Sequence, residues 1–539
     1  MSGVGKGVAT ASMGTLLSAK GFKVNLVKVD PYLNVDAGTM NPTEHGEVFV
    51  LNSGLETDQD MGNYERFLGR DLLPDDYVTS GMVYKYVIEK ERSLGYGGLC
   101  VEAIPHIRDE IVHRFKESAR VNKSDISIIE IGGTIGDYQN ALFIEAARSL
   151  KTKHPLDVIV IMVSYLPVPS KLGEMKTRPT QNAVHQLASY GLATDIIIGR
   201  SEIALDHKRK EKIAAASNIP PERVISAPDI ESIYDVPGNF EKDHLGKIIL
   251  EALSLPYRRP GVALTKWKKV AAGIKNHHAN EIHIGVVGKY FSTGDFTLSD
   301  SYLSVLEAIK FSAYAAGVRA VIQNINALDF EKKKPNYSLL DKLDGIVVPG
   351  GFGKTGIEGK IDVIRYAREN KIPYFGLCYG MQLMVVEYAR HVLGLADANT
   401  AEISPRGAHR VIDIMLEQKD KLIRKDFGGT MRLGLYPAQL ERGSIAHNAY
   451  GKDKIFERHR HRYEVNPDYV ERLSEAGLVF SGLSPDGRLC EIAELSAKKH
   501  PFFLGTQFHP ELLARPLSPH PLFSSFLKAA KKYKSKQKK

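Results

Sequence analysis

Two glycines that flank a cysteine constrain the fold of this chain more than any other feature. Gly376-Leu377-Cys378-Tyr379-Gly380 follows directly on the apolar run Ile372–Phe375. Between a strand and a helix, small residues on both sides of a central nucleophile allow a tight turn that presents its side chain at the end of the strand. The segment therefore predicts a strand–turn–helix unit of an α/β sheet, with Cys378 at the turn.

A histidine and a carboxylate far downstream are candidate partners for this thiol. His509-Pro510-Glu511 follows a second apolar run, Phe502–Gln507. A cysteine attacks as the thiolate, which requires a base, and the base requires a group that orients it. A lone cysteine is ordinarily a small buried hydrophobe, but the turn and the His–Glu pair favour catalysis. We interpret Cys378, His509 and Glu511 as a triad for acyl transfer through a thioester.

Apolar runs alternate with helix-like segments along both halves of the chain. Those of the first half are 22–29, 126–131, 158–163, 195–198 and 224–227, and those of the second half are 282–287, 345–348, 373–377 and 502–507. Continuous apolar runs are typical of buried parallel strands. The predicted fold is two doubly wound α/β domains, at 1–254 and 281–527, joined by a Pro-, Gly- and Lys-rich linker at 255–280.

Composition is that of a globular protein and argues against two classes of partner. The 539 residues have no uninterrupted apolar stretch of membrane-spanning length, and three cysteines favour a reducing cytoplasm over a disulfide framework. The net charge of +9 is largely due to seven lysines after residue 527. We therefore predict a basic disordered tail at 528–539 and neither a nucleic-acid nor a membrane partner.

Three polar segments of the first half are candidates for a nucleotide site. Ser2-Gly3-Val4-Gly5-Lys6-Gly7 precedes a helix-like stretch, and small residues before a lysine suit a phosphate cradle, although Gly7 stands where a P-loop has a hydroxyl. Asp60 and Glu130 are candidate Mg²⁺ ligands near strand ends. The cations and hydroxyls of 176–181 could hold a triphosphate, while an exposed loop is nearly as plausible there.

The chain resembles the glutamine-hydrolysing CTP synthases from Ser2 to about Phe526. The resemblance lies in several ordered stretches, namely SGVGKG, KVDPYLNVDAGTMNPTEHGEVFVLNSGLETDQDMGNYERF, IEIGGTIGD, KTRPTQ, VPGGFG, GLCYGMQL, ERHRHRYEVN and GTQFHPE. It implies a P-loop-like synthetase domain followed by a class I glutaminase domain. In this family ATP phosphorylates O4 of UTP, and ammonia from glutamine, passed internally, displaces the phosphate to give CTP.

The resemblance also implies a role for each matching residue. ATP is bound by Ser2, Gly3, Val4, Gly5, Lys6, Gly7, Asp60 and Ile230, with Asp229 beside the adenine and with Lys28 and Asp30 lining the site. Mg²⁺ is bound by Asp60 and Glu130. UTP, and CTP as feedback inhibitor, are bound by Ser2, Asp137, Tyr138, Gln139, Lys176, Thr177, Arg178, Pro179, Thr180, Gln181 and Lys212.

In the second domain the resemblance implies a glutamine site around the triad. Gly351, Tyr379, Gly380, Met381, Gln382, Glu402 and Arg462 bind glutamine, and Gly351 and Tyr379 supply oxyanion donors. The family further implies GTP as an allosteric activator, a homotetramer and possible filaments.

The sequence departs from the family pattern in three places. The family's phosphate loop follows a buried strand, whereas here Met1 stands directly before Ser2. Because losing a central strand would cost more than the roughly 5–15 kcal/mol margin of a domain, we expect the true start to lie upstream. Tyr138-Gln139 replaces the usual Ile-Glu, which predicts weaker CTP feedback. The loop 290–300 differs near the expected GTP site.

Two other hypotheses fit parts of the sequence. A different glutamine-dependent ligase, such as a cobyrinate-type amidase, would share the triad but gives no reason for KTRPTQ or GTMNPTEHGEVFV. An inactive, filament-forming paralogue is suggested only by the short phosphate loop. Dependence on UTP distinguishes the first alternative, and loss of CTP formation with glutaminase retained would indicate the second.

Overall fold

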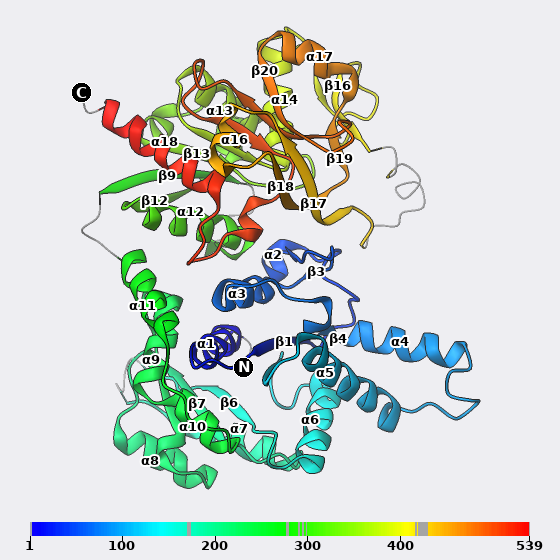
Figure 1. The fold of residues 1–539 in the computed structure, drawn as a ribbon, viewed down its shortest axis with the longest axis vertical. Coiled ribbons are helices and arrows are strands. Elements are labelled where there is room, and N and C mark those ends of the chain that lie inside the picture. Colours follow the sequence, from blue (N-terminus) through cyan, green and yellow to red (C-terminus); the bar gives the residue numbers. More distant parts are fainter. Residues whose placement is uncertain are drawn as a thin grey trace. The chain divides into compact units, whose positions relative to one another are not determined.

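The computed structural model describes residues 3–169, 174–275, 280–288, 292–293, 296–297, 299–415, 418 and 429–537 (Figure 1). The chain forms two compact units. Unit 1 comprises Met1–Asp36 and Asn63–Lys275, and unit 2 comprises Ala37–Gly62 and Asn276–Lys539. The predicted domain ranges place Ala37–Gly62 in the first domain, whereas its contacts place this segment in unit 2.

Unit 1 contains two parallel sheets among its described residues. One has the order β4 (Tyr77–Thr79), β1 (Val24–Asp30), β5 (Ile126–Ile131), and the other has β6 (Ile161–Tyr165), β7 (Ile196–Ser201), β8 (Val224–Pro228). Every residue of β1 is buried, as expected for a parallel strand covered on both faces. Polar groups at the carboxyl ends of these strands therefore lie at one edge of each sheet.

Helices pack against these sheets, and their apolar side chains complete each hydrophobic core. They are α1 (Lys6–Ala19), α3 (Gln59–Leu68), α4 (Ser80–Arg92), α5 (Arg108–Asn122), α6 (Ala141–Lys153), α7 (Arg178–Ser189), α8 (His207–Ser217), α9 (Val236–Lys242), α10 (Leu245–Ala252) and α11 (Val262–Ile274). The first residues of α3, up to Gly62, belong to unit 2. Val27, Val29 and Phe115 belong to one apolar cluster, and Ile197 and Val224 belong to another.

Unit 2 is built on a sheet of nine described strands. Its order is β12 (Arg319–Asn326), β9 (Glu281–Gly288), β13 (Gly345–Val348), β14 (Tyr374–Leu377), β22 (Phe503–Thr506), β21 (Cys490–Leu495), β20 (Leu478–Leu483), β17 (Arg432–Leu440), β18 (Lys454–His461). The strands from β12 to β22 pair in parallel, and those from β22 to β18 pair antiparallel. The parallel half places Cys378 beyond the end of β14.

Helices and short strands complete unit 2. The helices are α2 (Pro42–His45), α12 (Leu303–Ala315), α13 (Ile357–Glu369), α14 (Tyr379–His391), α16 (Ile445–Tyr450), α17 (Pro467–Glu475) and α18 (Pro521–Gln537). The short strands are β2 (Phe49–Val50) with β3 (Glu56–Thr57), β10 (Ser292–Thr293) with β11 (Phe296–Thr297), and the sheet of β15 (Asn399–Thr400), β16 (Arg410–Ile414) and β19 (Tyr463–Val465).

The predicted α/β fold with parallel sheets is confirmed, and a strand lies at each of the nine predicted apolar runs. The antiparallel strands β17, β18, β20 and β21 were not predicted. Polar residues interrupt or replace the apolar ones in these strands, as in the stretch 457–461, which reads ERHRH, so that no long apolar run marks them.

Two segments differ from their predictions. The predicted linker contains α11, whose Trp267 is buried and donates from Nε1 to the Tyr234 carbonyl at 2.8 Å. The tail predicted to be disordered from 528 is helical to Gln537, because Leu527 and Ala530 are buried along one face of α18. The ion pair between Lys534 and Asp344, at 3.0 Å, joins this helix to the residue that precedes β13. Figure 1 shows α18 beside β13.

None of the described helices is both long enough and apolar enough to cross a membrane.

Candidate active site

Cys378 lies at the sharp turn that the sequence predicted. It directly follows β14 and caps the N-terminus of α14, with φ 50° and ψ −100°. Such a conformation is strained for a residue with a Cβ atom and persists where surrounding structure enforces it. A Cβ atom at Gly376 would lie 2.7 Å from the Gly380 backbone, and one at Gly380 would lie 2.1 Å from the Val348 carbonyl oxygen. Both glycines are therefore required by close packing around the cysteine.

His509 and Glu511 meet Cys378 in one pocket. Nδ1 of His509 lies 2.7 Å from Oε1 of Glu511, and the backbone N–H of His509 donates to the Arg458 carbonyl at 2.8 Å. A Cβ atom at Gly350 would lie 2.8 Å from Cε1 of His509 and 3.7 Å from Cβ of Cys378, so both residues flank this glycine. The carboxylate thus fixes the imidazole with its second nitrogen available for the substrate.

The electrostatics of this pocket favour a charged histidine. Burial lowers the pKa of His509, but the negative charges of Glu511 and Cys378 raise it by more, to about 10. An imidazolium beside the sulfur, together with the N-terminus of α14, stabilises a thiolate. The arrangement can therefore attack a carbonyl carbon and then supply a proton to the leaving group.

The pocket wall includes residues distant in sequence. Besides the triad, the lining residues are Glu47, Val48, Ser301, Tyr302, Val305, Pro349, Gly350, Gly351, Phe352, Arg460 and Leu512. Glu47 and Val48 come from the segment Ala37–Gly62, and Glu47 accepts from the Ser304 N–H at 3.0 Å. Sequence reasoning missed this contribution, because only a long-range contact brings the segment to the pocket.

One of the residues predicted to bind glutamine lies in the wall of this pocket. Gly351 lines the pocket, whereas Gln382, Glu402 and Arg462 are not among its lining residues. Glu402 accepts from the Gly353 N–H at 2.7 Å, and Arg462 donates to Gln418 at 3.1 Å. The remaining three predicted residues, Tyr379, Gly380 and Met381, form the buried first turn of α14.

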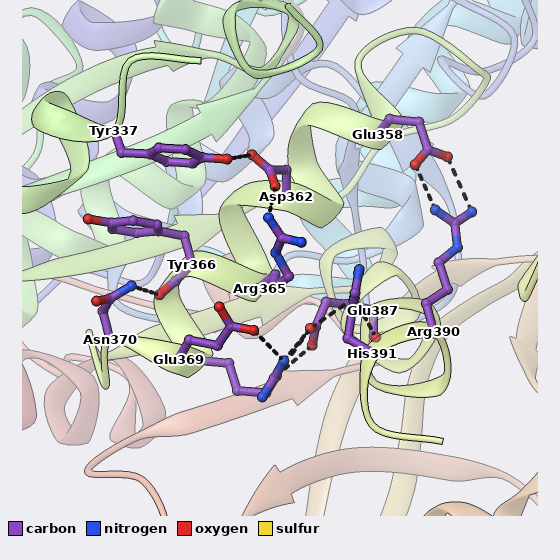
Figure 2. Close-up of polar contacts among 11 residues, drawn as sticks. Tyr337, Glu358, Asp362, Arg365, Tyr366, Glu369, Asn370, Glu387, Arg390 and His391 are labelled. Carbon is purple, nitrogen blue, oxygen red and sulfur yellow. Dashed lines mark hydrogen bonds and ion pairs between the residues drawn. The ribbon is translucent and has the colours of Figure 1, made fainter. Parts of the chain in front are cut away.

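Buried charges anchor the helix that carries the nucleophile (Figure 2). Glu387 of α14 is fully buried and accepts from Nε and Nη2 of Arg368 on α13, at 2.8–3.1 Å. His391 lies 3.2 Å from the same carboxylate. A second, more exposed pair joins Arg390 of α14 to Glu358 of α13 at 2.6 Å. These contacts fix the register of α14 against α13, and hence the position of its N-terminus.

The predicted phosphate loop of unit 1 ends where α1 begins. Gly3 and Gly5 have left-handed conformations, and α1 starts at Lys6 with Gly7 in its first turn. Nζ of Lys6 donates to the Gly133 carbonyl at 2.7 Å, which brings this loop to the end of β5. Val4 is buried, and Ser2 lies outside the described residues.

A buried charge cluster occupies the adjacent ends of β1 and β5. Nζ of Lys28 lies 3.3 Å from Glu130 and 3.5 Å from Asp30, and all three side chains are buried. Tyr64 donates to the other oxygen of Glu130. Among the described residues no group of three or more His, Cys, Asp or Glu is arranged to hold a metal ion. Asp60 belongs to unit 2, so its predicted pairing with Glu130 remains a prediction.

The predicted UTP residues are spread over three segments of unit 1. Thr177 and Thr180 are buried at the start of α7, where Thr180 bonds Ser164 at 2.9 Å and Gln181 is also buried. Lys176 pairs with Glu174 at 2.7 Å. The other members of this group are Arg178, Pro179 and Lys212, exposed on α7 and α8, and Asp137, Tyr138 and Gln139, at the turn before α6.

Tyr138 is 99% exposed, whereas Asp137 accepts from the Thr134 N–H at 2.8 Å. Ile230 is half-buried, and its neighbour Asp229 pairs with Arg200 at 2.8 Å. In the segment 290–300, predicted to lie near the GTP site, residues 290–291, 294–295 and 298 lie outside the described residues.

Fold and pocket together define a glutamine-hydrolysing enzyme of the class I amidotransferase type. The family model "Glutamine amidotransferase class-I" matches residues 297–529, and "CTP synthase N-terminus" matches residues 1–255. The chain is 48% identical to the CTP synthase of Pyrococcus abyssi, over 100% of the chain and 97% of that protein. It is 49% identical to the CTP synthase of Carboxydothermus hydrogenoformans, over 99% and 97%.

The chain belongs to the CTP synthase family. Members of this family use ATP and aminate UTP with nitrogen from glutamine. Among solved structures, the glutaminase domain of Trypanosoma brucei CTPS with bound acivicin is 37% identical and covers 47% of this chain and 94% of its own, with a TM-score of 0.43. The full-length match identifies the ligase family and so argues against the cobyrinate-type alternative.

Proposed function

We propose that unit 2 hydrolyses glutamine through a thioester on Cys378 and that unit 1 uses the released ammonia to convert UTP to CTP. The overall reaction is UTP, ATP, glutamine and water to CTP, ADP, phosphate and glutamate. The observation that carries the proposal is the pocket in which the strained Cys378, the raised-pKa His509 and Glu511 converge, in a chain of this family.

Glutamine hydrolysis follows from the charges of this pocket. The Cys378 thiolate attacks the carboxamide carbon of glutamine, and backbone N–H groups of Gly351 and Tyr379 stabilise the oxyanion. His509 protonates the leaving nitrogen, so that the C–N bond breaks and ammonia departs. His509 then removes a proton from water, which attacks the thioester, releases glutamate and regenerates the Cys378 thiolate beside the protonated His509. Glu511 keeps the imidazole in one orientation throughout.

The amination of UTP requires an activated oxygen, because the C4 carbonyl of uracil is amide-like and unreactive. Transfer of the γ-phosphoryl group of ATP to O4 makes that oxygen a leaving group, and ammonia then attacks C4 and displaces phosphate. We propose that Lys6 and Lys28 stabilise the negative charge that develops on the phosphoryl oxygens. Lys176 and residues 177–181, at the start of α7, are assigned to UTP, with Lys212 as a further cation.

Mg²⁺ fits the oxygen-rich end of β1 and β5. Glu130 and Asp30 are buried carboxylates, the ligand type that Mg²⁺ prefers, and the ion usually takes one or two of them together with phosphate oxygens and water. We propose Glu130 and Asp60 as its protein ligands. When bound, the ion would neutralise charge on the phosphates of ATP, while Lys28 balances the carboxylates in its absence.

Further properties are proposed from family membership. They are activation by GTP, feedback inhibition by CTP at the UTP residues, assembly as a homotetramer and a cytoplasmic location. The replacement of Ile-Glu by Tyr138-Gln139 leaves one acid fewer at the proposed pyrimidine site, so we expect CTP to inhibit this enzyme more weakly than its relatives.

Separate nitrogen donors test the division of labour between the units. CTP formation is followed spectrophotometrically with glutamine or with ammonium chloride, for the unmodified chain and for Cys378→Ala. We expect the variant to lose glutamine-driven synthesis by at least about 10³-fold, because the nucleophile is absent, and to keep ammonia-driven synthesis within about twofold. Glutamine-driven synthesis that survives in Cys378→Ala would contradict the thioester mechanism.

A further inference from the structure

A glutamine side chain approaches the nucleophilic sulfur from behind the pocket. Gln507 follows β22 directly and is 1% exposed, and its Nε2 lies 3.6 Å from Sγ of Cys378. The two residues belong to paired strand ends, since the backbone N–H of Cys378 donates to the Thr506 carbonyl at 2.6 Å. The mechanism proposed above assigns no task to Gln507.

The neighbours of Gln507 determine which end of its amide faces the sulfur. Gln382 donates from Nε2 to the Tyr463 carbonyl at 2.9 Å, and a carbonyl oxygen can only accept. The second hydrogen of the same nitrogen points to Oε1 of Gln507 at 3.3 Å. With its oxygen engaged in this way, Gln507 presents its NH₂ group to Cys378. The reverse orientation would oppose two NH₂ groups and would set an oxygen lone pair against the sulfur.

A chain of buried groups on β18 fixes the Tyr463 carbonyl in turn. Nδ1 of His461 lies 3.0 Å from this oxygen and must donate to it, so Nε2 of His461 accepts from Nδ1 of His459 at 3.0 Å. Burial lowers the pKa of both imidazoles, that of His461 to about 3, so both rings are neutral at pH 7. Nε2 of His459 lies 3.7 Å from the buried Glu491, which pairs with Arg432 at 2.8 Å.

We propose that Gln507 is a catalytic residue that stabilises the Cys378 thiolate by donating a hydrogen bond from Nε2, and that Gln382, through the Tyr463 carbonyl, positions its amide. The inference rests on the proposed thioester chemistry and adds a donor to it. In the neutral thiol, Sγ can donate to the Arg460 carbonyl at 3.7 Å. After deprotonation that contact lacks its proton, whereas the bond from Gln507 becomes charge-assisted and stronger.

The charge on Cys378 can be measured directly by alkylation. The rate of modification by iodoacetamide is followed between about pH 5 and 10 by mass spectrometry of the Cys378 peptide, in the full chain. Exposed Cys100 is alkylated in the same sample and serves as an internal control. The other charged groups that line the pocket are Glu47, Arg460, His509 and Glu511, and all remain unchanged in the variants.

Two substitutions separate donation to sulfur from packing. Gln507→Glu keeps the shape and still accepts from Gln382 but offers no N–H group to Sγ when ionised, and Gln507→Leu removes both bonds. We expect the alkylation midpoint of Cys378 to rise by roughly one pH unit in each, equivalent to a tenfold loss of thiolate. For glutamine hydrolysis, kcat should fall about tenfold or more, with KM changed less than about threefold.

A third variant tests the orientation of the amide. Gln382→Glu leaves Gln507 in place but removes the N–H group that donates to its oxygen, so the alkylation midpoint of Cys378 should also rise. The double variant Gln382→Glu/Gln507→Leu should have the same midpoint as Gln507→Leu alone. Thermal unfolding midpoints identify variants that fail to fold.

Unchanged alkylation midpoints in well-folded Gln507→Glu and Gln507→Leu would overturn the inference and leave the thioester mechanism standing. Glutamine hydrolysis that persists in Cys378→Ser would instead refute the proposed function itself.

Discussion

At the scale of single residues, the active pocket is a set of opposed charges around one sulfur atom. The imidazole of His509 is buried, which by itself disfavours its charged form, yet Glu511 and Cys378 more than offset this effect. The histidine therefore carries its proton at neutral pH, which suits its proposed role as the acid that releases ammonia.

The pH dependence of glutamine hydrolysis should report this histidine. Because His509 is protonated below its raised pKa, kcat/KM should decline on the alkaline side as pH rises through about 10. In Glu511→Gln the nearby negative charge is lost, the pKa of His509 falls, and the alkaline limb should move to lower pH by roughly one unit or more. Profiles measured with glutamine as substrate test this, and an unshifted limb would assign the titration to another group.

At the scale of elements, helix α14 and strand β18 hold the pocket together. The pair of the buried Glu387 with the partly buried Arg368 ties α14 to α13 (Figure 2). On β18 the side chains alternate, so that Arg458 and Arg460 reach the hairpin β2–β3, at Asn52 and Glu56, while His459 and His461 lie on the opposite face. A strand with polar partners on both faces has little freedom to shift in register.

The ion pair between Arg368 of α13 and Glu387 of α14 leads to a prediction about local stability. Arg368→Met should leave the carboxylate of Glu387 buried without its main cation, which costs about 3 kcal/mol or more. Hydrogen exchange of the α14 amides, measured by mass spectrometry, should then accelerate about 100-fold.

The double variant Arg368→Met/Glu387→Leu should recover most of this protection, because no unpaired charge remains. Glu358→Gln is the matched control, since this carboxylate is 60% exposed and its pair with Arg390 is worth less than about 1 kcal/mol. Equal acceleration in the control would show that burial of the pair is not what matters.

Sequence predicted the elements whose signal is local. The strands of the parallel sheets are continuous apolar runs, and the turn at Cys378 is marked by its glycines, so both were found. The tail was misjudged because its lysines outweighed the helical spacing of Phe523, Phe526, Leu527 and Ala530, all fully buried. Glu47 and Gln507 lie in stretches that carry the family resemblance, but no local pattern marked them for the pocket, since their positions there depend on contacts between residues far apart in the chain.

At the scale of the whole molecule, unit 2 is assembled from two separate stretches of the chain. Ala37–Gly62 packs with residues beyond 275, through the fully buried Arg458 and through the ion pair of Arg460 with Glu56 at 2.7 Å. Part of the pocket proposed to bind glutamine is therefore encoded in the N-terminal half of the sequence.

A substitution in the segment Ala37–Gly62 should change the steady-state constants of glutamine hydrolysis. Glu47→Ala removes a side chain of the pocket wall and its hydrogen bond to the start of α12. We expect KM for glutamine to rise about fivefold and kcat to change less than twofold, because the lost contact would stabilise the ground state and the transition state equally. Glu44→Ala, on an exposed residue of the same segment, should leave both constants unchanged. Steady-state kinetics with glutamine measure both constants, and an unaltered KM in Glu47→Ala would exclude a role for Glu47 in glutamine binding.

The split composition of unit 2 has a consequence for biosynthesis. Asn52 and its partner Arg458 are separated by 406 residues, so the hairpin leaves the ribosome long before the strand that receives it is translated. At roughly 5–20 residues per second this interval lasts some tens of seconds. Throughout that time the nascent hairpin lacks its partner strand, so the second unit can be completed only late in synthesis.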